Sequence, residues 1–139
     1  MSAPLLYSNV TPMRGEAAAQ WFITTFAVNG WSGAWRGPID EAPHYHLNSH
    51  KVLGIFEGEA DLQFGGPGGQ VLRVRAGDVV VIAAGLAHAM IAASDPFEAI
   101  GATPGGLRPD LHYGGGAPAP APLRPRADPV LGPGRGFVA

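Results

Sequence analysis

The sequence contains no cysteine among its 139 residues, so disulfides, thiolate metal sites and cysteine nucleophiles are all excluded. Lysine is almost absent too, because Lys51 is the only one and every other basic side chain is an arginine. Charged residues make up 14% of the chain, and the formal net charge is −2 without any basic cluster. Because phosphate binding needs clustered Lys and Arg, neither nucleic acid nor a membrane surface is an expected partner. A small-molecule ligand, neutral or anionic, fits this composition better.

Long apolar runs are missing as well. No segment reaches the roughly eighteen apolar residues of a membrane span, and the N-terminus lacks the basic stretch followed by an apolar run that marks a signal peptide. We therefore expect a soluble, cytoplasmic protein. The length suits one domain, residues 1–139, with a real core. The 21 glycines and 14 prolines indicate many turns and little helix.

One short helix is expected near the N-terminus. After an alanine-rich start, Trp21, Phe22 and Phe26 follow one another at roughly helical spacing, and Asn29-Gly30 is a typical left-handed stop. The β-branched residues at positions 23 to 25 weaken the helical pattern, which leaves a strand as the alternative.

Residues 44–101 alternate short apolar runs with turn sequences. The turns are Glu57-Gly58, the Gly-rich stretch 65–69 and residues 76–78. Strands at this spacing are typical of a β-sandwich or barrel, so we predict an all-β fold whose barrel spans about residues 30–113. Residues 114–139 are too rich in Pro and Gly for a sheet. We expect them to form a tail, either loose or draped over the barrel, which can contact a second subunit.

Histidines mark the candidate site. His44 and His46 are two residues apart, so on a strand their side chains point to the same side, as adjacent metal ligands require. His50 follows four residues later, and His88 follows the turn at Gly85. These four histidines, from two hairpins, could converge inside a barrel. Two histidines on one strand are also common as ordinary surface or core residues.

The first of these segments resembles the first motif of the cupin superfamily. That motif is His-x-His, three or four residues, Glu, six residues and Gly. Here His44, His46 and Gly58 stand at the matching positions, while Lys51 takes the place of the glutamate.

The second segment resembles the second cupin motif, which is Gly, five residues, Pro-x-Gly, two residues, His, three residues and Asn. Gly77, Gly85 and His88 match, whereas Ala83 replaces the proline and Ala92 the asparagine. The stretches "HYHLNSHKVLGIF", "NGWSGAWRGPI" and "ADPVLGPG" further resemble small bacterial single-domain cupins of the YjlB-like type.

The resemblance implies a cupin (RmlC-like) β-barrel or jelly roll that holds a divalent transition metal, such as iron, zinc, nickel, manganese or copper. It also implies an enzyme of dioxygenase or isomerase type acting on a small organic acid or carbonyl compound. Because cupin-like barrels usually pair through exposed sheets, we expect a homodimer. The alternative is a metal-free barrel that binds a small molecule without catalysis.

Lys51 leaves the ligand set open, because the resemblance implies a carboxylate at its position. A protonated amine cannot ligate a metal and repels a dication. The site could consist of His44, His46 and His88 with Lys51 turned aside. Alternatively, His50 could add a fourth nitrogen, and such a set suits zinc, nickel, copper or iron more than magnesium or calcium.

Two further interpretations give Lys51 a different place. In a metal-free barrel, burial lowers the pKa of a lysine, which can then act as the catalytic base or Schiff-base group. Otherwise Lys51 points outward and pairs with Glu57 or Glu59.

Overall fold

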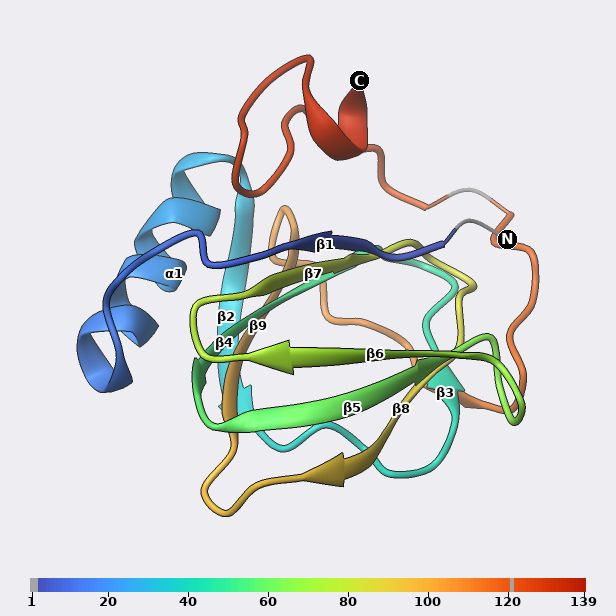
Figure 1. Ribbon diagram of the computed structural model, residues 1–139. Coiled ribbons are helices and arrows are strands. Elements are labelled where there is room, and N and C mark those ends of the chain that lie inside the picture. Colours follow the sequence, from blue (N-terminus) through green and yellow to red (C-terminus); the bar gives the residue numbers. More distant parts are fainter. Residues whose placement is uncertain (1–2, 121) are drawn as a thin grey trace.

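The chain forms two five-stranded antiparallel sheets and one helix in a computed structural model, which describes residues 3–120 and 122–139 (Figure 1). The first sheet has the order β1-β7-β4-β9-β2 and the second β10-β3-β8-β5-β6. The first comprises β1 (Leu5–Tyr7), β2 (Trp31–Gly37), β4 (Lys51–Glu57), β7 (Val79–Ile82) and β9 (Glu98–Pro104). The second comprises β3 (His44–Tyr45), β5 (Glu59–Phe64), β6 (Gln70–Arg75), β8 (His88–Ala93) and β10 (His112–Tyr113). This arrangement confirms the predicted all-β jelly roll.

The turns between strands fall where glycine was found in the sequence. Gly58, between β4 and β5, has φ 78°, and Gly85, before β8, has φ 88°. A side chain at Gly58 would also collide with the carbonyl oxygen of Pro96, and one at Gly85 with that of Ala117. Both motif glycines are therefore required by the backbone conformation and by close packing.

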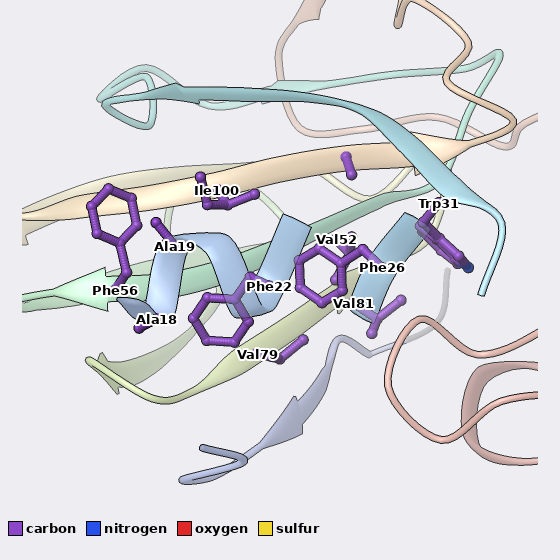
Figure 2. Packing of buried hydrophobic residues seen from close by; sticks show 11 residues of the cluster. Ala18, Ala19, Phe22, Phe26, Trp31, Val52, Phe56, Val79, Val81 and Ile100 are labelled. Carbon is purple, nitrogen blue, oxygen red and sulfur yellow. The ribbon is translucent and has the colours of Figure 1, made fainter. Parts of the chain in front are cut away.

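The predicted helix is present as α1 (Gly15–Val28), so the strand alternative is wrong. Its buried face, which includes Phe22 and Phe26, packs on the outer side of the first sheet (Figure 2). Val52 and Ile100 of the sheet belong to the same buried cluster. Burial of this apolar face outweighs the low helix propensity of the β-branched residues on α1.

A second core fills the space between the two sheets. Leu53 and Ile55 of β4 point into it and meet Leu62 from the opposite sheet. Because side chains alternate along a strand, Lys51 shares the inward face of Leu53 and Ile55. The beginning of β4 therefore places the only lysine of the chain inside the barrel.

The C-terminal segment returns over β1 and β2, where Figure 1 shows it in red. The buried Asp128 accepts hydrogen bonds from the Tyr7 hydroxyl at 2.6 Å and from the Phe137 amide at 2.8 Å. The indole nitrogen of Trp31 donates to the carbonyl of Ala127 at 2.9 Å. The draped form of the tail is therefore the one observed. The described residues contain no helix long and apolar enough to cross a membrane.

Candidate metal centre

Three of the predicted histidines meet inside the barrel. His44 on β3 lies directly opposite His88 on β8, and their ring centroids are 4.2 Å apart. His46, immediately after β3, completes the group, with one ring nitrogen of each histidine within 4.8 Å of the others. All three side chains are buried. Their spacing and burial match what a metal ion requires of three protein ligands.

Backbone carbonyl groups fix the orientation of each imidazole. Nδ1 of His44 lies 2.9 Å from the carbonyl oxygen of Ala42, and Nδ1 of His88 lies 3.0 Å from that of Leu86. Nδ1 of His46 pairs in the same way with the carbonyl of Asp110. Because a carbonyl only accepts, each Nδ1 carries the proton, and each Nε2 keeps its lone pair. The same outer hydrogen bonds orient histidine ligands in known metal sites.

The free ring nitrogens have no other use within the described part of the chain. Nε2 of His46 and Nε2 of His88 are fully buried and have no hydrogen-bond partner there. A buried polar atom without a partner is costly, and a bound cation would satisfy both. The three histidines therefore fit a divalent transition metal, which prefers imidazole ligands.

The electrostatics of the group favour neutral imidazoles. Burial, together with the charge of Lys51, lowers the pKa of His46 to about 4 and that of His88 well below its usual value. Burial also lowers the pKa of His44. Metal ligation requires the neutral ring, so near pH 7 the group is already in the protonation state that binds a cation.

His50 does not join this group. Its Nδ1 accepts a hydrogen bond of 2.8 Å from the Ala84 amide, so Nε2 carries the proton and neither nitrogen offers a free lone pair. Its ring packs edge-on against Phe137 of the C-terminal segment, at a centroid distance of 4.9 Å. The expectation that His50 adds a fourth nitrogen fails because the residues after His46 carry it toward the C-terminal segment.

Lys51 lies in the barrel rather than on its surface. Its side chain is only 6% exposed, which rules out the outward position paired with Glu57 or Glu59. Burial lowers the pKa of Lys51 to about 7, and the charge of Asp40 offsets only part of this effect. The residue at the glutamate position of the motif is thus a buried amine beside the histidines.

An adjoining cavity of about 290 Å³ gives a small molecule access to the group. His44, His46 and Lys51 line it on the polar side. Its apolar wall is formed by Trp35, Ile39, Leu53, Ala99, Pro109 and Leu111. A site with a few convergent polar groups in an apolar cavity is typical of small-molecule binding.

Asp110 was not found from the sequence, although it supports His46 from 64 positions away. Besides its carbonyl bond to His46, its side chain accepts the Leu47 amide at 2.8 Å and the Asn48 amide at 3.3 Å. The role of Asp110 depends on a backbone carbonyl and a long loop, and no motif marks either. Trp35, which no motif marks either, lies in the cavity wall.

Comparisons with known proteins agree with this architecture. A cupin family model matches residues 41–104. This range includes β3 and β8, the strands that carry His44 and His88. The uncharacterized protein YjlB of Bacillus subtilis (strain 168) is 36% identical over 110 residues, or 79% of this chain. The match covers 64% of YjlB, less than two thirds of its length. Residues 41–104 of this chain are thus similar to the cupin family, and the two sheets form a jelly roll of the cupin type.

Solved structures give looser similarities. Procruciferin, an 11S globulin from Brassica napus, has a TM-score of 0.48 and 24% identity over 58% of this chain and 22% of its own. Acireductone dioxygenase from Bacillus anthracis, with a cadmium ion in its active center, has a TM-score of 0.46 and 11% identity. That match covers 72% of this chain and 76% of the dioxygenase.

Proposed function

We propose that the protein is a metal-dependent cupin enzyme of dioxygenase or isomerase type that acts on a small organic acid or carbonyl compound. In this proposal, His44, His46 and His88 hold a divalent transition metal through their Nε2 atoms. The observation that carries it is the pair of buried, unpartnered Nε2 atoms on His46 and His88. A bound metal would supply Lewis-acid or oxygen-activating chemistry.

The residues around the histidines have supporting roles. The carbonyls of Ala42, Leu86 and Asp110 hold the three rings in the ligating tautomer. The apolar wall of the cavity lowers the polarity beside the histidines, which strengthens electrostatic interactions there. The size of the cavity restricts the ligand to a small molecule.

Elemental analysis of untagged protein tests the metal assignment. We expect about one transition-metal ion per chain, lost in His88→Ala. His50→Ala is the matched control, since Nδ1 of His50 accepts the Ala84 amide and its ring packs on Phe137, outside the three-histidine group. Oxygen uptake with small organic acids and carbonyl compounds then tests the reaction type. Absence of metal after reconstitution with iron, zinc, nickel, manganese or copper would contradict the proposal.

The burial of Lys51 and its pKa of about 7 favour a second candidate function. In a metal-free barrel, the neutral amine of Lys51 would condense with a carbonyl substrate, releasing water and forming an imine. Cyanoborohydride would reduce this imine to a stable secondary amine. Mass spectrometry of the trapped protein should then locate the adduct on Lys51, and an unmodified Lys51 would exclude this function.

A further inference from the structure

The ammonium group of Lys51 is the one cationic side chain in the cavity wall. It is buried, and no hydrogen bond or ion pair joins it to any residue within 3–120 or 122–139. A buried charge of this kind is unfavourable unless a partner compensates it. When Lys51 is protonated, its charge therefore has no bonded partner in the described part of the protein.

Asp40, at the same cavity, is already engaged. One of its oxygens accepts the Ala42 amide at 2.9 Å, and the other accepts the Tyr113 hydroxyl at 3.1 Å. Its charge offsets that of Lys51 at longer range without bonding to it. When the neutral histidines hold a divalent cation, the charge of that cation is left uncompensated. A glutamate at position 51 would have reduced this excess charge, whereas Lys51 does not.

We propose that the ligand of the metal-loaded cavity is a small organic carboxylate whose anionic group pairs with Lys51 and whose apolar part lies against Trp35 and Leu53. The proposal rests on the proposed metal function and specifies its ligand class. The carboxylate replaces, from outside the chain, the negative charge that the motif normally supplies from within. The apolar wall and the volume of about 290 Å³ favour a compact body over an extended one.

Lys51 should affect metal affinity and carboxylate affinity in opposite directions. Its positive charge repels the cation, so replacing Lys51 should strengthen metal binding in the absence of a ligand. The same replacement should weaken binding of the carboxylate to the loaded site, because the anion loses its partner. A lysine with only a packing role would not produce this reversal.

The test uses Co²⁺-loaded protein in chloride-poor buffer, with benzoate as the probe and benzamide as its neutral counterpart. Calorimetry and the visible spectrum of Co²⁺ both report binding. We expect wild type to bind benzoate about tenfold more tightly than benzamide, and Lys51→Met to lose about tenfold in benzoate affinity while its Co²⁺ affinity rises. Lys51→Gln gives a second variant of similar size. Arg73→Gln, which alters an exposed cation on β6 that pairs with Asp61, should change neither affinity.

Linkage gives a readout that needs no variant. Benzoate should raise the Co²⁺ affinity of wild type by the same factor by which Co²⁺ raises its benzoate affinity. If Co²⁺ binds but benzoate and benzamide bind equally, or if both Lys51 variants retain benzoate affinity, the carboxylate proposal is overturned alone. If Co²⁺ does not bind wild type, the metal function fails, and this inference fails with it.

Discussion

His44 and His88 lie directly opposite one another on β3 and β8, with their ring centroids 4.2 Å apart. The strand register thus brings two residues from the separate cupin motifs into contact. Both rings donate Nδ1–H to the backbone two residues before them, at Ala42 and Leu86. Each ring is therefore oriented by the residues just before its own strand, and the two rings meet when the strands pair.

The pH dependence of folding stability should report the burial of Lys51. Its pKa falls from 10.5 in the unfolded chain to about 7 in the folded one. The unfolded state therefore holds more protons between these values, so the free energy of unfolding of the metal-free protein should rise from about pH 7 to pH 10. Lys51→Met removes this effect. The variant should be more stable by a few kcal/mol near pH 7, at about 1.4 kcal/mol per pKa unit.

Urea unfolding at several pH values measures this difference. The advantage of Lys51→Met should shrink steadily from pH 7 to pH 10.5, because the wild-type amine becomes neutral in both states only above its unfolded pKa. Arg73→Met, at an exposed position, serves as the control and should show no such trend. If the stability difference between wild type and Lys51→Met stays constant from pH 7 to pH 10, burial does not lower the pKa of Lys51, and this prediction is wrong.

Asp110 should support metal affinity without touching the metal. Its carboxylate holds the amides of Leu47 and Asn48, and this loop positions His46. In Asp110→Ala, loss of these bonds should loosen His46 and weaken Zn²⁺ binding by about tenfold, as for other outer-shell residues. Competition with a chelator measures the affinity. Asp95→Ala, at an exposed turn, is the control and should bind Zn²⁺ like wild type. If Asp110→Ala also binds Zn²⁺ like wild type, Asp110 does not support the histidine group.

Gly54 should tolerate no side chain. A Cβ at this position of β4 would lie 2.6 Å from the ring of Phe22, a buried residue of α1 that packs in the core. Gly54→Ala should therefore lower the free energy of unfolding by about 1–3 kcal/mol through overpacking. Gly37→Ala is the matched strand control, because nothing lies within 4 Å of its added Cβ. Similar thermal stability of the two variants would mean that α1 packs elsewhere.

Asp128 should anchor the C-terminal segment. Its carboxylate accepts the Tyr7 hydroxyl and the backbone amides of Val130, Leu131 and Phe137. Asp128→Ala leaves these donors without a partner, so hydrogen exchange should become faster from position 128 to the C-terminus. Tyr7→Phe removes one bond only and should cost about 1 kcal/mol. Unchanged exchange in Asp128→Ala would show that the segment is held by its apolar contacts instead.

Much of the fold could be predicted from local sequence patterns. The glycine turns, the helical spacing of Phe22 and Phe26, and the His-x-His pair each encode a structural feature within a few residues, so most strands, α1, His44 and His46 could be predicted. His88 was predicted from the second motif. The short strand β1 was not predicted, because three residues give no periodicity and its place depends on pairing with β7.

The surroundings of the site could not be predicted in the same way. The sequence offers four histidines near the motifs, and two tertiary contacts separate His50 from the other three: the hydrogen bond from the Ala84 amide and the packing of its ring on Phe137. Whether Lys51 points in or out depends on the register of β4, which a single-residue shift would reverse. Asp110 acts through its backbone carbonyl, a group that every residue possesses. These features arise from tertiary packing, which leaves no local signal.

The central claim is that three histidine Nε2 atoms hold one metal ion beside a buried lysine. A crystal structure of Co²⁺-loaded protein with anomalous data tests it most directly. We expect one strong anomalous peak from a Co²⁺ ion bound by His44, His46 and His88. His50 should still accept the hydrogen bond from the Ala84 amide. A peak that involves His50, or no peak at the three histidines, would contradict the account.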